Sequence, residues 1–164
     1  MTTANDVEQQ FLALLERNKN TIYKVCLMYS NEQEGLNDNY QEVVLNLWKA
    51  FPNFNHSSKD STWVYQIALN TCISQLRHKK AGPELQPITI DVAQLVDDSA
   101  EHREQIMELY RLINRLTDLE KAIIMLWLDE KSYDEIAEVT GISKSNVGVR
   151  INRIKEKLRL MSNK

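Results

Sequence analysis

The sequence predicts an all-α protein built from two small helical domains joined by a flexible linker. Apolar residues recur at every third or fourth position in one segment after another, which is typical of amphipathic helices. No segment shows the alternation of polar and apolar residues that indicates a β-strand. Residues 82–99 break the helical period with Pro83, Pro87 and several acids. We therefore expect a linker there, between domains at residues 1–81 and 100–164.

Three helices are expected in the first domain. The first spans about residues 7–29, and its polar run at residues 17–20 favours a bend or an interruption. The second spans about residues 37–51 and ends at the following proline. Residues 52–60 are polar and predict a loop, and a third helix begins near Ser61 and ends in a cationic cluster. The apolar side chains expected on one face of each helix include Phe11, Leu14, Ile22, Val25 and Cys26, then Tyr40, Val43, Leu47, Trp48 and Phe51, then Trp63, Val64, Ile67, Ala68 and Cys72.

The second domain is predicted to open with a helix over residues 100–116. Thr117 can cap the next helix, and Glu120 completes a capping box three residues later. That helix is strongly apolar, and residues 129–131 then turn the chain. The C-terminal part of the sequence therefore continues as a series of short helices.

Residues 132–159 predict a helix-turn-helix. Ser132 and Glu135 form a capping box for a short helix that stops at Gly141, where the turn requires a residue that tolerates positive φ. Ser143 caps the second helix. Its apolar stripe is Val147, Ile151, Ile154 and Leu158, and its other faces carry Lys144, Ser145, Asn146, Arg150, Asn152, Arg153, Lys155 and Lys157. The pattern favours a helix that reads the major groove of DNA, and the alternative is a basic helix that closes a bundle.

The charge is distributed unevenly along the chain. The net charge is −3, yet residues 143–164 carry seven Lys or Arg and one acid, so the remainder of the chain is acidic. A basic C-terminal helix on an acidic body fits local docking on DNA better than a protein coated in cations.

Several classes of function find no support in the sequence. We expect Cys26 and Cys72 to be buried free thiols, and no His or Cys spacing indicates a metal site. No nucleophile with a base, phosphate loop or cofactor motif is present, so we expect neither an enzyme nor a cofactor. No apolar run is long enough to insert in a membrane, and no signal peptide is visible, which favours the cytoplasm.

Four blocks of residues, in order, carry a resemblance to a known family. They are 38–43 with Leu45, Leu47 and Trp48; 63–70 with Leu76 and Arg77; Leu116 with 119–128; and 132–137 with Gly141, Ile142, Ser143, Val147, Arg150, Arg153, Lys157 and Leu158. Together they resemble the extracytoplasmic-function (ECF) subfamily of the sigma-70 family of bacterial RNA polymerase sigma factors. The resemblance covers nearly the whole length except the linker.

The resemblance implies a protein that binds core RNA polymerase, directs it to promoter DNA and helps to open the duplex. In the first domain, it implies contacts with the clamp helices of the largest polymerase subunit through outward polar residues, namely Asp38, Gln41, Glu42 and Asn46. It also implies an anti-sigma factor as a partner, and a possible docking site for the polymerase flap along residues 116–128. The alternative is that these polar residues have no binding role and form the solvated face of an amphipathic helix.

The resemblance also implies two contacts with DNA. The residues for the minus-ten element are Phe54, Asn55, His56, Lys59, Trp63, Asn70, Arg77, Lys79 and Lys80, although Trp63 fits a core position equally well. For the minus-thirty-five element, the residues expected to contact base edges are Ser145, Asn146, Val149, Asn152 and Arg153. Those expected to contact phosphates are Lys144, Arg150, Lys155 and Lys157. Arg150 could instead pair with Asp134 or Glu138.

The alternative function is a helix-turn-helix regulator that acts alongside another sigma factor. It explains the C-terminal half of the sequence, but it leaves the blocks at residues 38–43 and 63–70 without a role.

Overall fold

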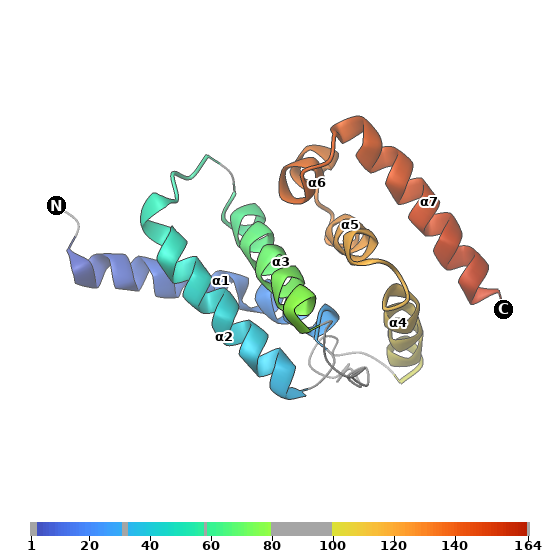
Figure 1. The fold of residues 1–164 in the computed structure, drawn as a ribbon, viewed down its shortest axis with the longest axis horizontal. Coiled ribbons are helices and arrows are strands. Elements are labelled where there is room, and N and C mark those ends of the chain that lie inside the picture. The colour runs from blue at the N-terminus through green and yellow to red at the C-terminus, as the bar shows by residue number, and fades with distance from the viewer. Residues whose placement is uncertain (1–2, 31–32, 58, 80–99, 164) are drawn as a thin grey trace. The chain divides into compact units, whose positions relative to one another are not determined.

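The computed structural model describes residues 3–30, 33–57, 59–79 and 100–163, and every regular element among them is a helix (Figure 1). The chain divides into two compact units, one within Met1–Ile88 and the other within Thr89–Lys164. The prediction of an all-α chain with two helical domains is therefore confirmed. The linker predicted at residues 82–99 lies outside the described residues, so the exact domain limits stay a prediction.

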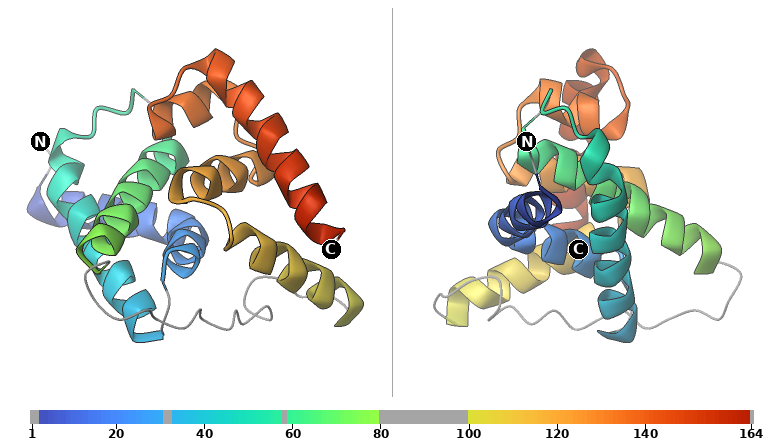
Figure 2. Two further views of the ribbon diagram at one scale, coloured as in Figure 1. Left: turned by 45° about the vertical axis from the view of Figure 1, so that its right-hand side comes forward. Right: turned by 90° about the vertical axis from the view of Figure 1, so that its left-hand side faces the viewer.

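The first unit packs three helices against one another. They are α1 (Ala4–Met28), α2 (Gln33–Ala50) and α3 (Asp60–Lys79), and a short 3-10 helix, η1 (Phe51–Asn53), follows α2 (Figure 2). Each of the three long helices contacts the other two. The proline predicted to end α2 lies inside η1, where its fixed φ is compatible with a tight turn.

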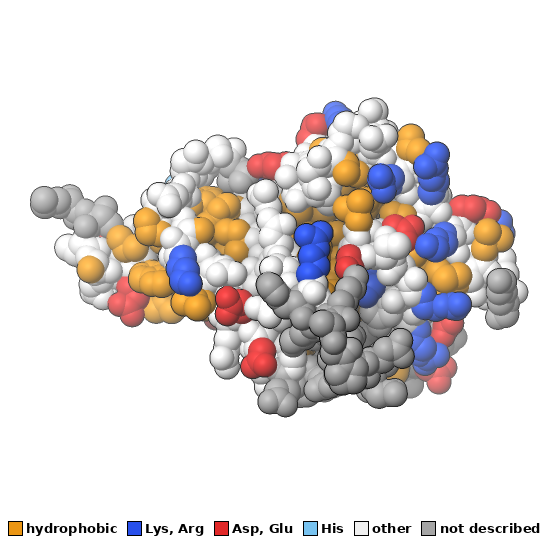
Figure 3. Space-filling view, in the orientation of Figure 1, with side chains coloured by type: hydrophobic (Ala, Val, Ile, Leu, Met, Phe, Trp, Pro, Cys, Tyr) orange, Lys and Arg blue, Asp and Glu red, His pale blue; other side chains and the backbone are white. Residues whose placement is uncertain are grey.

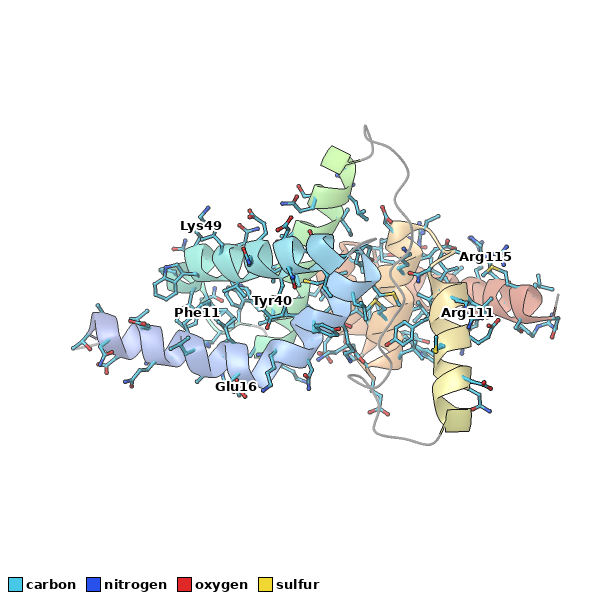
Figure 4. The ribbon with its side chains drawn as sticks, turned by 90° about the horizontal axis from the view of Figure 1, so that it is seen from below. Phe11, Glu16, Tyr40, Lys49, Arg111 and Arg115 are labelled. Carbon is cyan, nitrogen blue, oxygen red and sulfur yellow. The ribbon has the colours of Figure 1, made fainter. Side chains whose placement is uncertain are left out.

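α1 is one continuous helix, so the interruption allowed at residues 17–20 does not occur. Its ribbon changes direction near the labelled Glu16 (Figure 4), which agrees with the predicted bend. Asn18 is buried in this stretch and donates its Nδ2–H to the carbonyl oxygen of Leu14 at 2.9 Å. A polar side chain can be accommodated inside the helix because the backbone supplies its partner.

The core of the first unit consists of apolar side chains that are almost completely buried. They are Ile22, Val25, Cys26, Val43, Leu47, Val64, Tyr65, Ala68 and Cys72. The two thiols are free, as predicted, and their Sγ atoms lie 3.9 Å apart. The hydrogen bond with Cys26 and the burial of the site raise the pKa of the Cys72 thiol, which keeps it protonated.

Trp48 is not part of this core. Its side chain is 44% exposed, and its ring lies beside that of Phe11, with the centroids 5.0 Å apart. The expectation that Trp48 lies on the buried face of α2 is therefore wrong. Leu47 already points into the core, and the next residue on a helix is rotated by about 100° from it.

Over residues 100–163, the second unit forms four helices: α4 (Ala100–Ile113), α5 (Asp118–Leu128), α6 (Tyr133–Thr140) and α7 (Lys144–Ser162). α7 contacts each of the other three, and α5 also contacts α6. The side chains that fill the space between them are Ile113, Ile123, Leu126, Ile136, Val147, Ile151 and Ile154. α4 ends earlier than expected, three residues before Leu116.

Two predicted capping boxes are present in the second unit. At the start of α5, the Thr117 hydroxyl accepts from the Glu120 N–H at 3.3 Å, and the Glu120 carboxylate accepts from the Thr117 N–H at 3.0 Å. Ser132 and Glu135 make the same pair of hydrogen bonds at the start of α6. Each box satisfies backbone donors that have no partner inside the helix, and so fixes where the helix begins.

Candidate nucleic-acid interface

α6 and α7 form the predicted helix-turn-helix. Gly141 ends α6 with φ at +79°, and its N–H donates to the carbonyl oxygen of Ala137 at 2.9 Å. Ser143 then caps α7, and its hydroxyl accepts from the Asn146 N–H at 3.3 Å. A side chain at position 141 would be strained by the positive φ although space is open around it, which explains the choice of glycine.

The side of α7 that points away from the unit carries the residues predicted to meet base edges. We call these five residues the reading face: Ser145, Asn146, Val149, Asn152 and Arg153. All five are exposed, and the buried stripe of Val147, Ile151 and Ile154 lies on the opposite side of the helix. In Figure 3, Lys and Arg side chains gather along the band that α7 occupies. The geometry gives α7 an accessible polar surface, while the base contacts stay a prediction.

The cations at the start of α7 differ from the predicted arrangement in one pair. Lys144, not Arg150, pairs with Asp134, with Nζ and Oδ1 3.3 Å apart. Arg150 is exposed and forms no ion pair with the described residues, so the alternative pairing with Asp134 or Glu138 is not formed. Arg150 is therefore available for a phosphate.

Two later cations of α7 are held against α5. The Nζ of Lys155 lies 4.4 Å from the centroid of the Trp127 ring, a cation–π distance. Lys157 donates to the Glu120 carboxylate at 3.0 Å. Burial alone would raise the pKa of Glu120, but hydrogen bonds from the Thr117 backbone and from Lys157 outweigh it, and the pKa is lowered. Both lysines thus have an intramolecular role that sequence reasoning missed.

Gly148 lies where α7 passes the beginning of α6. A Cβ at position 148 would approach the Tyr133 ring to 3.3 Å, closer than most side-chain contacts. The missing side chain therefore lets the Tyr133 ring lie directly on α7. Tyr133 itself stays 40% exposed.

In the first unit, the loop before α3 is held by aromatic rings. Phe54 contacts Trp63 and His56 edge-on, with ring centroids 4.3 Å apart in each pair, and Phe51 lies 6.4 Å from Trp63. We call these four residues the aromatic clamp. Trp63 and Phe54 are half-buried. The clamp joins the described part of this polar loop to Trp63 on α3.

The remaining minus-ten candidates fall into two groups. Asn55, His56 and Lys59 are exposed on the loop, and Asn70 and Arg77 are exposed on α3. Asn55 accepts the Ser57 N–H through Oδ1 at 3.0 Å, and His56 adopts a positive φ of 59°, so the loop turns sharply there. Lys79 belongs to α3 but its side chain lies outside the described part, as does the whole of Lys80.

The polymerase-binding candidates on α2 do not all point outward. Asp38 and Gln41 are exposed and Glu42 is half-buried. Asn46 is turned inward and donates its Nδ2–H to the Thr71 hydroxyl on α3 at 2.9 Å, so the expectation of an outward Asn46 is wrong. Its partner lies far away in the sequence, and helical spacing alone could not reveal it.

Two exposed apolar residues extend the outward side of α2. Leu45 and Trp48 are both 44% exposed. Together with Asp38 and Gln41 they are spaced by three, four and three residues, which places all four on one stripe of a helix. We call these four residues the α2 stripe. The spacing could have identified this stripe in the sequence, had Trp48 not been assigned to the interior.

The second unit also has an open groove of about 510 Å³ where α5 ends and α6 begins. It is lined by Trp127, Leu128, Glu130, Lys131, Ser132 and Tyr133. Leu128 is 44% exposed there. Within the described residues, no three His, Cys, Asp or Glu side chains come together as metal ligands would. None of the described helices combines the length and apolar character needed to cross a membrane.

Comparisons with known protein families match both units. The family described as Sigma-70 region 2 matches residues 14–82, and the family described as Sigma-70, region 4 matches residues 106–158. The ECF RNA polymerase sigma factor SigW of Bacillus subtilis is 30% identical, over 93% of this chain and 88% of that protein. The ECF RNA polymerase sigma-E factor of Haemophilus influenzae is 26% identical, over 91% of this chain and 85% of that protein.

Solved structures share the fold. The sigma factor RpoE from Bartonella quintana, in complex with the anti-sigma factor NepR, matches with a TM-score of 0.74 over 98% of both chains, at 18% identity. CnrH in complex with the cytosolic domain of CnrY matches with a TM-score of 0.69 over 95% of this chain and 89% of the other, also at 18% identity. The helical architecture is therefore one that known proteins adopt along almost their whole length.

Proposed function

This chain belongs to the ECF subfamily of the sigma-70 family, whose members are the RNA polymerase sigma factors that direct transcription initiation, and we propose how its two units divide that task. The first unit docks on core polymerase and captures the minus-ten element. The second unit reads the minus-thirty-five element. The observation that carries the proposal is that a region 2 match and a region 4 match occur in one chain, one in each unit.

The α2 stripe is the proposed contact with the polymerase clamp helices. Asp38 and Gln41 supply polar contacts, and Leu45 and Trp48 add exposed apolar area that binding would remove from water. Glu42 is half-buried and contributes at the edge. Asn46 is omitted from this contact because its amide is engaged with Thr71.

The loop held by the aromatic clamp is the proposed site for the non-template strand of the minus-ten element. Asn55 and His56 offer polar groups for the edge of an unstacked base, and Phe54 and Trp63 offer ring surface nearby. Lys59, Asn70 and Arg77 lie exposed on the loop and α3, and with Lys79 and Lys80 they would hold phosphates or the strand backbone.

The reading face of α7 is the proposed contact with the minus-thirty-five element. Arg153 to guanine and the two asparagines to adenine are the pairings that their side chains favour. Lys144 and Arg150 lie near the same end of the helix as phosphate contacts. Lys155 and Lys157 contribute less to DNA binding, because Trp127 and Glu120 already hold them against α5.

The groove between α5 and α6 is the proposed docking site for the polymerase flap. Trp127, Leu128 and Tyr133 give it an apolar lining, and an apolar helix would fit such a lining. We therefore propose that the flap docks at the end of α5 and the start of α6, within and just beyond the expected residues 116–128.

We further propose an anti-sigma partner and a cytoplasmic location. RpoE and CnrH, whose folds resemble this chain, were both solved as complexes, RpoE with an anti-sigma factor. A protein that covers the α2 stripe would block polymerase docking. The chain itself carries out no chemical step in this scheme, because the polymerase supplies the reaction. Adding the products of the neighbouring genes should reduce transcription, and an unchanged yield with all of them would remove the anti-sigma proposal.

Reconstituted transcription tests the main proposal. Purified chain, core polymerase and promoter DNA should give specific transcripts with no other sigma factor present. A helix-turn-helix regulator would give transcripts only after a second sigma factor is added. Substituting both Leu45 and Trp48 by Ser should reduce binding to core polymerase, whereas Leu160→Ser, which removes a still more exposed leucine at the end of α7, should not.

A further inference from the structure

The outermost side chain of the reading face is apolar. Val149 is 46% exposed, although its neighbours on this face are Ser145, Asn146, Asn152 and Arg153. With about 100° of rotation per residue, Val149 points almost directly away from the centre of the buried stripe. Val149 is therefore the first side chain to contact a surface that this face of α7 approaches. An apolar group in this position gains free energy only if the partner also presents an apolar group.

The residues around Val149 indicate that the group it contacts belongs to a base pair. Ser145 lies one helical turn before it, and Asn152 and Arg153 lie one turn after it, so hydrogen-bonding groups surround one methyl-bearing side chain. This combination suits the floor of the major groove. There, the C5-methyl of thymine is the apolar group among the polar edges of the four bases.

Glu156 limits how far the DNA-contacting surface of α7 can extend, and Val149 lies at the centre of the part that remains. Glu156 lies on the same side of α7, one turn beyond Asn152, and its carboxylate accepts from Arg159 Nε at 3.0 Å. A carboxylate facing phosphates would oppose DNA binding, so the contact should end before residue 156. The usable span runs from Ser145 to Arg153, about 12 Å of helix, with Val149 at its centre.

We propose that Val149 is a specificity-determining residue that contacts the C5-methyl group of a thymine in the minus-thirty-five element. The inference rests on the proposed role of α7. An adenine, guanine or cytosine at this point would place donors or acceptors against a side chain that cannot pair with them, while the duplex excludes water. The element is therefore expected to have one position where thymine is favoured because of its methyl group.

Uracil substitution tests this inference because uracil pairs as thymine does and lacks only the methyl group. The complete chain with core polymerase would first select promoters from duplexes randomised over the minus-thirty-five element. Each thymine of the selected element would then be replaced by deoxyuridine, one position at a time. We expect about a fourfold loss of holoenzyme binding at one position, the effect of one methyl-sized contact, and smaller losses at the others.

Two variants assign the effect to Val149. Val149→Ser should abolish both the thymine preference and the uracil penalty at that position, and leave the other positions unchanged. Leu160→Ser, which alters an exposed leucine of α7 beyond Glu156, should keep both. A penalty that persists in Val149→Ser, or the absence of any uracil-sensitive position, would overturn the inference. Failure to select any promoter would instead count against the proposed function.

Discussion

The two surfaces proposed to contact DNA hold their side chains in different ways. The reading face belongs to α7, whose backbone hydrogen bonds and buried stripe hold all the residues of that face in place. The loop before α3 has no such ladder, and its geometry depends on Phe54 lying against Trp63 and His56. A change on α7 should therefore act locally, whereas the loss of one ring should disturb the whole loop.

The largest effect is expected from removing the ring on which the loop depends. Trp63→Ala should lower the free energy of unfolding of the first unit by about 2–3 kcal/mol, because the substitution removes the half-buried indole at the centre of the aromatic clamp. Minus-ten opening by the holoenzyme should fail, while binding of a minus-thirty-five duplex should persist. Urea unfolding followed by circular dichroism and permanganate footprinting of the promoter measure the two effects.

Trp48→Ala is the matched control for this prediction. It removes the same side chain from a more exposed position, so the expected cost is smaller, about 1 kcal/mol. Equal losses in stability from both substitutions would show that Trp63 has no special role as an anchor of the loop.

The next prediction tests whether a substitution on α7 affects only the contact that its own side chain makes. Arg153→Ala should weaken binding to the selected promoter by about 2 kcal/mol, or about 30-fold, because one bidentate base contact is lost. Binding to random duplex should change little, and the stability of the second unit should be unaltered because Arg153 is exposed. Fluorescence anisotropy with both duplexes measures the difference. Lys157→Ala serves as the control, because a lysine that contacts only phosphate should affect binding to both duplexes alike. Equal losses on both duplexes for Arg153→Ala would indicate that Arg153, too, contacts only phosphate.

A smaller effect is expected at the start of the helix-turn-helix. Ser132→Ala removes the hydroxyl that accepts from the Glu135 N–H, and should lower the stability of the second unit by about 1 kcal/mol. Ser132→Asp should restore most of it. Calorimetry should show the change in the second unit only, whereas Thr3→Ala, which breaks the capping box of α1, should affect only the first. An effect of Ser132→Ala on the first unit would contradict independent folding of the two units.

The smallest effect concerns pH. The folded-state pKa of Glu120 is lowered from 4.5, so its contribution to stability is present above the unfolded-state pKa and is lost as the pH falls through the folded one. The ion pair is partly exposed, with the Lys157 side chain 46% and the Glu120 side chain 21% exposed, and we expect it to contribute less than about 1 kcal/mol. Glu120→Gln keeps a capping side chain and removes the charge. Its stability should fall less between pH 6 and pH 3 than that of the wild type, and parallel curves would disprove the contribution.

The features predicted correctly from the sequence are mostly local. Ser132, Ser143 and Gly141 set the ends of α6 and α7 through groups within four residues, so their roles follow from spacing alone. The outward position of the reading face followed from the helical period, because the apolar stripe of α7 is unambiguous.

Two contacts that the sequence did not reveal involve partners distant along the chain. Asn46 turns toward Thr71, and Lys157 pairs with Glu120, 37 residues earlier. Such contacts depend on how the helices cross, which periodicity does not encode. Trp48 was misplaced for a related reason: the period gives the direction of a side chain to within one residue, and packing decides which of two neighbours is covered.

The buried thiols have a consequence for studying the chain in one piece. The sequence contains two cysteines, both in the first unit, and neither is exposed. A thiol reagent such as Ellman's reagent can therefore react only when the first unit opens. The rate of labelling in the intact chain then reports the opening of the first unit. A partner that binds that half should slow the labelling in proportion to its occupancy.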